Sequence, residues 1–440
     1  MKKINFKKVI TVGMAAVMCM SFLGACGAQK AADETVTETE TTSDESGVSE
    51  ETSNFGFGMS ADSGVKLEDV EVQHNTNFGG MNIMISIDEF NSNGFQYGDS
   101  VKITLSNGKV YEDIPYYDGY HTRTGELVLC AYPGYTSIHF TRNNSGDIWD
   151  EDDETALLKS AADEENDFWF ELGLSADEKL TATFEVTEAG KYLEAEQAMS
   201  LVYSDDRTKY DSDVIFANFR EITCADIAAD TLYRSASPCN NEHNRASYVD
   251  TLAQEAGINF ILNLADNEDE VAGYMEMEDF NSPYFESLLD RGQVSLIDLT
   301  AAYRTDVYIQ KVVEGFTAMS ETDPPYLFHC TEGKDRTGFI AILLECLCGA
   351  DYDEMKDDYM ITYSNYYKVD EDSEPEKYAA IVDIKFNDMV FYLETLEYGE
   401  GTEKTEDVDF EACARDYLHH GGMEDEQIDK LIFKLTHDRN

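Results

Sequence analysis

HCTEGKDRTG, at residues 329–338, is the stretch that decides the fold of this 440-residue chain. It follows the apolar run YLFH at 326–329 and leads into an almost wholly apolar segment at 337–348. A buried strand that turns into a buried helix points several backbone N–H groups into the connecting loop, and the helix dipole adds partial positive charge. The stretch therefore predicts an anion site at the start of a helix.

The side chains of this loop supply the parts of a nucleophilic site for phosphate. The helix field, Lys334 and Arg336 all favour the thiolate of Cys330, which is the form that attacks phosphorus. The planar guanidinium of Arg336 can hold two phosphate oxygens and stabilise transition-state charge. Gly333 permits the backbone angle needed to wrap an anion. We therefore predict Cys330 as the nucleophile and Arg336 as the residue that holds the phosphate.

The remaining loop residues are expected to support these two. The Thr337 hydroxyl is placed to donate to the thiolate when a phosphocysteine breaks down, and His329 is expected to fix the loop from beneath rather than to act as an acid. No metal or cofactor is expected, because arginine and backbone amides supply the positive field that metals supply elsewhere. The predicted phosphate-binding set is Thr331, Glu332, Gly333, Lys334, Asp335 and Arg336.

A leaving alkoxide or phenoxide needs a proton, so a carboxylic acid is expected near the loop. Two residues can supply it. Asp335 lies in the loop itself, whereas Asp298 ends an apolar run upstream of it. The sequence favours Asp335 and leaves Asp298 open.

The segments around the motif indicate an α/β fold from about residue 211 to residue 440. The runs 258–264, 294–299 and 326–329 are typical of buried strands, and 337–348 is typical of a helix that is apolar on most sides. Strands that alternate with helices predict a central parallel sheet covered on both faces. Ligands bind at the carboxyl ends of strands in such sheets, which is where residues 329–338 lie.

Residues 66–205 are predicted to form a separate β-rich domain. Asn107-Gly108 lies between the strand-like runs 101–105 and 109–111, which is a strong hairpin pattern. The run 81–87 is also strand-like, and 180–186 alternates between apolar and polar residues. A small sandwich or barrel is expected, and its sequence indicates no function.

The first 65 residues are interpreted as a targeting segment and a tether. Residues 1–26 combine a basic start, a short apolar run and the sequence LGAC, which resembles the bacterial lipoprotein cleavage box. This predicts a lipid on Cys26 and a protein anchored outside the cytoplasm to the bacterial cell membrane. The alternatives are an ordinary signal peptide cleaved nearby and an uncleaved anchor. Residues 27–65 are acidic and poor in apolar side chains, as expected of a disordered tether.

The charge of the chain limits its partners. With 89 acidic against 32 basic residues, the net charge is −57. Such a surface repels phosphate backbones, which argues against a nucleic-acid partner. An anionic substrate must therefore be attracted by a local positive site, such as the loop.

The motif resembles the signature of cysteine-dependent tyrosine and dual-specificity phosphatases. Its GKDRTG portion is similar to a bacterial tyrosine phosphatase branch that also acts on phosphoinositides, and in that branch the loop aspartate, here Asp335, is implicated in catalysis. The resemblance covers roughly the last half of the chain. It includes NFREI at 218–222, LYRSA at 232–236, DYMIT at 358–362 and the terminal segments 417–418, 421–423 and 428–435.

Two positions depart from this branch. Its usual Asp-Leu-Arg, which braces the phosphate loop, is replaced by Asn263-Leu264-Ala265, and its Gly-Gly is replaced by Thr223-Cys224.

The resemblance implies a phosphate monoester hydrolase that acts through a phosphocysteine on phosphotyrosine proteins or peptides. The alternatives are a phosphoinositide or inositol phosphate phosphatase, a non-catalytic phosphate-binding pseudophosphatase, and a surface adhesion lipoprotein. The expected partners are the phosphorylated substrate and, through the lipid on Cys26, the membrane.

Overall fold

The computed structural model describes residues 64–76, 79–132, 135–143, 167–399 and 401–437. The predicted signal peptide at 1–26, the lipid attachment residue Cys26 and nearly all of the predicted tether at 27–65 lie outside these ranges. Within the described ranges, none of the helices combines the length and the apolar character that crossing a membrane requires.

The first part of the described chain forms a closed seven-stranded barrel, in the strand order β1-β2-β6-β5-β4-β3-β7. This agrees with the expected β-rich domain. Short helices accompany the barrel: α1 (Ile87–Ser92), α3 (Phe168–Glu171) and α4 (Leu193–Met199). The strands are β1 (Lys66–His74), β2 (Met81–Ile83), β3 (Ser100–Leu105), β4 (Val110–Tyr117), β5 (Leu127–Cys130), β6 (Ile138–Arg142) and β7 (Lys179–Glu188).

Local sequence explains two features of the barrel domain. The predicted hairpin is present: β3 and β4 pair antiparallel on either side of Gly108. The φ of Gly108 is 89°, which suits a tight turn. The strand expected over 81–87 is wrong beyond Ile83. The Ser86 side chain accepts a hydrogen bond of 3.2 Å from the backbone N–H of Glu89, and this cap begins helix α1 instead.

The second part of the described chain is built on a five-stranded sheet in the order β11-β10-β12-β9-β8. Strands β9 (Leu232–Ser235), β10 (Phe260–Asn263), β11 (Val294–Leu296) and β12 (Tyr326–His329) are parallel, as predicted. The edge strand β8 (Arg220–Glu221) is antiparallel to β9, so the sheet is mixed. In this register Asn263 and Ser235 both align with His329, so three strands end together.

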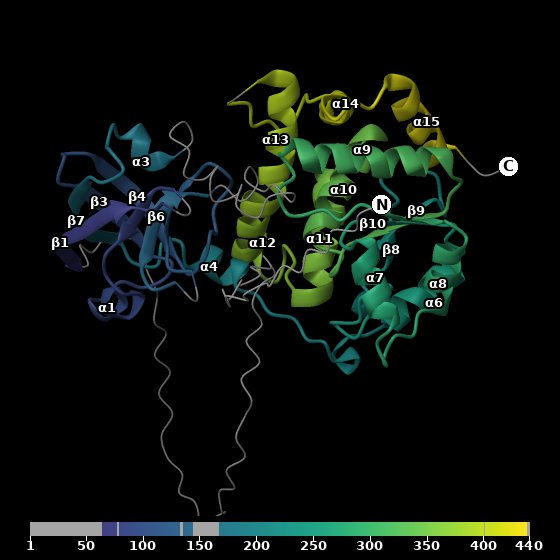
Figure 1. The fold of residues 1–440 in the computed structure, drawn as a ribbon, viewed down its shortest axis with the longest axis horizontal. Helices are drawn as coiled ribbons and strands as arrows, with labels where there is room; N and C mark the ends of the chain where they lie inside the picture. Colours follow the sequence, from purple (N-terminus) through teal and green to yellow (C-terminus); the bar gives the residue numbers. More distant parts are fainter. Residues whose placement is uncertain (1–63, 77–78, 133–134, 144–166, 400, 438–440) are drawn as a thin grey trace, which may run out of the picture. The chain divides into compact units, whose positions relative to one another are not determined.

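Helices cover both faces of this sheet. Successive strand residues point to opposite faces, so Leu262 and Phe328 belong to a core with α9, α10, α14 and α15, while Ile261 and Leu327 belong to a second core with α6 and α8. Figure 1 shows the two groups of helices on opposite sides of the strands. The helices are α5 (Asp213–Phe216), α6 (Ala246–Ala256), α7 (Glu268–Met275), α8 (Pro283–Asp290), α9 (Asp306–Glu321), α10 (Asp335–Leu347), α11 (Tyr352–Tyr367), α12 (Pro375–Ile381), α13 (Asn387–Tyr398), α14 (Phe410–His420) and α15 (Asp425–Thr436).

Candidate active site

The loop of residues 330–334 joins the end of β12 to the start of α10. The strand and the helix that flank it are both buried, as their apolar sequences predict. Cys330 is the first loop residue and is only 3% exposed. The backbone N–H groups of the first turn of α10 have no partner within the helix, so the structure places the cysteine at the kind of helix terminus that binds anions.

Gly333 shows why the loop needs a residue without a side chain. Its φ is 71°, and a Cβ atom at this position would lie 2.4 Å from the carbonyl oxygen of Ser235 in the neighbouring strand. The carbonyl of Gly333 accepts two hydrogen bonds, from Asn218 Nδ2 at 3.0 Å and from Arg234 Nη2 at 3.2 Å. The loop is therefore fixed from outside by side chains that are distant in sequence.

A buried ion-pair network holds these two side chains in place. Asp358 Oδ2 accepts a hydrogen bond of 2.6 Å from Arg234 Nη1, and Asp358 Oδ1 accepts one of 2.8 Å from Arg220 Nε. Burial works to raise the pKa of Asp358, but Arg220 and Arg234 outweigh it and hold the pKa well below its ordinary value. Arg220 Nη1 also donates to Asn218 Oδ1 at 2.9 Å, which orients the Asn218 amide.

This network gives a structural role to segments that the sequence identified only by resemblance. NFREI at 218–222, LYRSA at 232–236 and DYMIT at 358–362 supply the side chains that brace the loop. The strand β10, which ends in Asn263 where the related branch has aspartate, contributes in another way: the backbone N–H of Leu264 donates to the carbonyl of His329 at 2.9 Å. The sequence signal that could have indicated such a network is an arginine within the strand run at 232–235, because an arginine that is buried needs anionic or carbonyl partners.

His329 is the last residue of β12 and directly precedes the loop, and its predicted role as a support of the loop stays a prediction. Its side chain is fully buried, and its Nδ1 lies 3.2 Å from the carbonyl oxygen of Cys330. Burial lowers the pKa of His329 to about 4. A histidine that is neutral near pH 7 can position the loop but is a poor proton source there. Among the residues that the structure describes, its Nε2 has no hydrogen-bond partner.

Arg336 is held at both ends of its guanidinium fork. Nη1 donates to the carbonyl oxygen of Leu299 at 3.0 Å, and Nη2 donates to Thr331 Oγ1 at 3.2 Å. These contacts orient a bidentate group from the first turn of α10 across the loop that contains Cys330. The geometry is suited to holding two oxygens of a phosphate group.

Both candidate acids are next in sequence to residues of the Arg336 contacts, because Asp335 directly precedes Arg336 and Asp298 directly precedes Leu299. Asp335 is the first residue of α10, and its side chain is 52% exposed. Asp298 immediately precedes Leu299, and its side chain is 44% exposed. Its backbone is held at a φ of 43°, and its carbonyl accepts a hydrogen bond of 2.7 Å from Lys311 Nζ. Both carboxyls can reach solvent, and the choice of Asp335 stays a prediction.

Thr337 and Glu332 have contrasting surroundings. Thr337 is fully buried, and its hydroxyl makes no hydrogen bond within the described part of the chain, so its donation to the thiolate stays a prediction. Glu332 directs its carboxylate away from a phosphate-binding role, because Oε1 accepts from Tyr203 at 2.8 Å and Oε2 lies 3.1 Å from Lys334 Nζ. Its predicted contact with phosphate therefore rests on its backbone N–H. No pattern in the sequence indicated that Tyr203 belongs to this site.

Three potential metal ligands come close together elsewhere in the described ranges. Donor atoms of Asp118, His121 and Glu196 lie within 4.8 Å of one another. The first two follow strand β4 and the third is in α4, so none of them belongs to the loop.

Comparisons with known proteins agree with this geometry. The profile described as the tyrosine phosphatase family matches residues 216–437, which is slightly more than half of the chain. A search of curated protein sequences gives no match.

Similar solved structures include two of TpbA from P. aeruginosa and one of SIW14 from S. cerevisiae. A Cys-to-Ser variant of TpbA in complex with pTyr is 20% identical, with 34% of this chain and 78% of that chain covered at a TM-score of 0.22. The core catalytic domain of the PP-IP phosphatase SIW14, in complex with citrate, is 15% identical, with 42% and 96% covered at a TM-score of 0.24. A second TpbA structure is 19% identical, with 37% and 96% covered at a TM-score of 0.21.

The family match and the geometry of the loop concern the same residues. The matched range contains Cys330, Arg336 and the side chains that brace Gly333. The chain belongs to the tyrosine phosphatase family, whose members hydrolyse phosphoric monoesters.

Proposed function

We propose that this protein hydrolyses phosphotyrosine in proteins or peptides through a phosphocysteine intermediate on Cys330. The observation that carries the proposal is the position of this buried cysteine between β12 and the first turn of α10, beside an arginine whose fork is already oriented. The helix terminus and Arg336 together favour an anion at this point and the thiolate that attacks it.

In the first step, the Cys330 thiolate attacks phosphorus. An S–P bond forms as the P–O bond to the tyrosine oxygen breaks, and Asp335 gives its proton to the leaving oxygen, with Asp298 as the alternative donor. Arg336 and the loop amides bind the remaining phosphoryl oxygens and stabilise their charge in the transition state.

In the second step, water attacks the phosphocysteine. A P–O bond forms, the S–P bond breaks, and inorganic phosphate leaves, while the carboxylate that lost a proton takes one from the water. The hydroxyl of Thr337, at the buried start of α10, donates to the departing thiolate. The cycle restores Cys330 as a thiolate and consumes one water for each ester.

The proposal is tested by phosphate release from p-nitrophenyl phosphate, a phosphotyrosine peptide and a panel of phosphoinositides, all with EDTA present. The fragment that begins at Lys66 is compared with its Cys330→Ser variant and with Cys413→Ser, which removes a buried thiol outside the loop. We expect turnover that survives EDTA, that is lost in Cys330→Ser and that is kept in Cys413→Ser. Absence of turnover by reduced, folded protein that still binds vanadate would leave a phosphate-binding module instead.

We also propose that a lipid on Cys26 anchors the protein outside the cytoplasm. The proposal is supported by the basic start, the short apolar run and the LGAC sequence of residues 1–26. Full-length protein expressed in a bacterial host should partition with membranes, and Cys26→Ala should release it or leave its precursor unprocessed. Equal partitioning of both processed forms would contradict lipidation.

A further inference from the structure

The phosphate loop, defined as residues 330–334 together with the first turn of α10, carries two cationic side chains, Lys334 and Arg336, and only one of them is available to a substrate. Arg336 contacts a carbonyl and a hydroxyl, both uncharged, so its positive charge is not compensated by these partners. Lys334 is different, because its Nζ lies 3.1 Å from Glu332 Oε2 and 3.8 Å from Asp335 Oδ2. It also donates to the Tyr367 hydroxyl at 3.2 Å.

The Glu332 carboxylate is fixed in this position rather than free to swing away. The residue is 8% exposed, and Oε1 accepts a hydrogen bond of 2.8 Å from Tyr203. Its backbone carbonyl accepts another, of 2.7 Å, from the hydroxyl of Tyr366 on α11. Burial works to raise the pKa of Glu332, but Lys334 and the bond from Tyr203 outweigh it and lower the pKa. The side chain is therefore a carboxylate at neutral pH.

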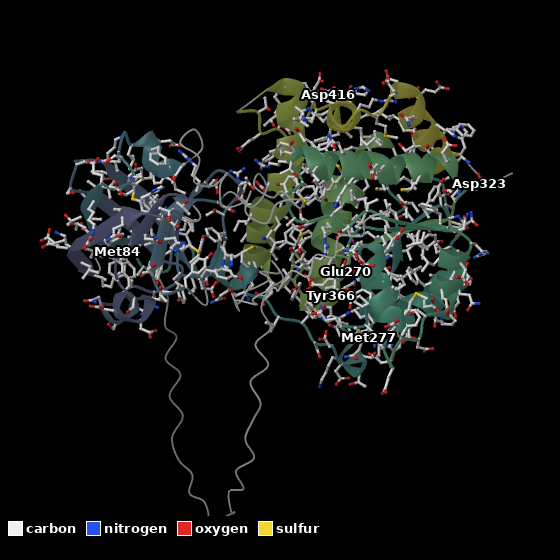
Figure 2. The ribbon with its side chains drawn as sticks, viewed as in Figure 1. Met84, Glu270, Met277, Asp323, Tyr366 and Asp416 are labelled. Carbon is white, nitrogen blue, oxygen red and sulfur yellow. The ribbon has the colours of Figure 1, made fainter. Side chains whose placement is uncertain are left out.

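The partner of Glu332 is held as firmly as Glu332 itself. The ring of Tyr203 stacks on that of Tyr366, which Figure 2 labels, with centroids 5.0 Å apart and an angle of 28°. The guanidinium of Arg245 lies 4.8 Å from the first ring and 4.9 Å from the second. Arg245 is 2% exposed and donates to the carbonyl of Ser204 at 3.2 Å. These contacts therefore hold Tyr203 and Ser204, which precede the phosphatase fold in sequence, next to the loop.

These contacts decide which phosphate esters the loop can favour. A substrate with a second phosphate beside the scissile one needs a second free cation, because each added phosphate brings further negative charge. Lys334 is compensated inside the protein, and the fixed carboxylate of Glu332 repels such a group. A monoester with a single phosphate needs only Arg336 and the loop amides.

We propose that Glu332 is a specificity-determining residue, which holds Lys334 within the protein and restricts the site to esters whose scissile phosphate has no second phosphate beside it. The inference rests on the proposed function and names its substrate class: aryl monophosphates such as phosphotyrosine, rather than inositol phosphates with adjacent phosphate groups. Tyr203 acts as a positioning residue, because its hydroxyl holds the Glu332 carboxylate.

The test compares kcat/KM for a phosphotyrosine peptide with kcat/KM for a soluble inositol trisphosphate that carries two adjacent phosphates. Glu332→Gln keeps the shape and an acceptor for Tyr203 but removes the charge. We expect it to raise the ratio of trisphosphate to peptide activity by about tenfold or more. Tyr203→Phe keeps the charge and should change the ratio less. Adding Lys334→Met to Glu332→Gln should return the ratio to the wild-type value or below.

Two controls distinguish this effect from the loss of any negative charge and from unfolding of the variant. Glu314→Gln removes one negative charge from an exposed position of α9 and should leave the ratio unchanged. Thermal unfolding of each variant shows whether it is folded. A ratio in Glu332→Gln within about twofold of the wild-type ratio would overturn the inference, and so would a wild-type enzyme that already prefers the trisphosphate.

Failure of the proposed function is recognised separately. If no variant releases phosphate from either compound, the chain is not the proposed hydrolase. The specificity is then measured as the ratio of the two dissociation constants, by calorimetry on Cys330→Ser with and without Glu332→Gln. A rise in relative affinity for the trisphosphate still supports the role of Glu332, and an unchanged ratio overturns it.

Discussion

The guanidinium of Arg234 donates to the carbonyl oxygen of Gly333 through Nη2, at 3.2 Å, and to Asp358 through Nη1, at 2.6 Å. One fully buried side chain therefore connects the phosphate loop to helix α11. The position of this carbonyl also fixes the orientation of the peptide units around it, and therefore of the backbone N–H groups that are proposed to bind phosphate.

Removal of the Asp358 charge should destabilise the protein. Asp358→Asn leaves Arg220 and Arg234 buried without their anion, and breaking a buried pair in this way costs about 3–5 kcal/mol. Urea denaturation measures the loss. Asp357→Asn, at the preceding, exposed position of the same helix, should lie within about 0.5 kcal/mol of the wild type. Similar effects of the two substitutions would argue against the network.

Gly333→Ala should abolish phosphate binding. The alanine Cβ would lie 2.4 Å from the backbone oxygen of Ser235, so either the loop or strand β9 must move. Gly349→Ala is the matched control, because Gly349 also has a positive φ, 85°, but no atom would lie within 4 Å of its Cβ. Both alanines would have a positive φ, which costs an L-residue roughly 1–2 kcal/mol in either variant. Only Gly333→Ala should lose vanadate binding in calorimetry, and retention of binding would show that the loop tolerates the displacement.

Substitution of the two candidate acids should separate their roles. We expect Asp335→Asn to lower kcat on a phosphotyrosine peptide by about 10²–10⁴, because the leaving oxygen then departs without a proton. The loss should be smaller for p-nitrophenyl phosphate, whose leaving group needs less protonation. Asp298→Asn should change both activities less. The reverse pattern, with the leaving-group dependence in Asp298→Asn, would assign the acid to Asp298.

Acidification should destabilise the fold through buried histidines. Burial lowers the pKa of His329 from about 6.5 to about 4, so the unfolded chain binds a proton at a pH where the folded chain does not. The stability contributed by neutral His329 is complete above about pH 6.5 and is lost as the pH falls towards 4, on the order of 3 kcal/mol in total. His121 and His139, whose pKa values burial also lowers to about 4, add to the same slope.

The contribution of His329 is isolated by comparing the wild type with His329→Asn in urea denaturation across this pH range. The substitution removes one titrating group, so the decline in unfolding free energy with acid should be shallower in the variant, whatever its stability at pH 7. Parallel declines would show that the imidazole titrates normally in the folded protein.

Local patterns were sufficient to predict the elements that carry the loop. The alternation of β7, the Asn107-Gly108 turn and the apolar runs of β10 and β12 each encode their own structure within a few residues. The prediction for 81–87 failed because a single capping side chain, Ser86, outweighed the β-propensity of the residues around it. Helix caps act over three residues and are easily hidden within an apolar run.

The contacts that tune the loop could not be predicted in the same way. Tyr203 reaches Glu332 across 129 positions of sequence, and Asn218 reaches Gly333 across 115. The spacing of apolar residues along the sequence does not indicate such long-range contacts, because they form only when the sheet and its helices pack together. The pairing of Cys330 with Arg336 could be predicted because one residue is in the short loop before α10 and the other is in the first turn of that helix.

The bracing of Gly333 also determines when the site can exist during synthesis. Cys330 and Arg336 leave the ribosome before Asp358, Thr362 and Tyr366, all of which belong to α11. A nascent chain that ends before α11 lacks the anion that holds Arg234 and the hydroxyl that holds Glu332. Cys330 is therefore made well before the residues that shape its loop, so a partly synthesised chain contains the proposed nucleophile without the side chains that brace Gly333 and Glu332.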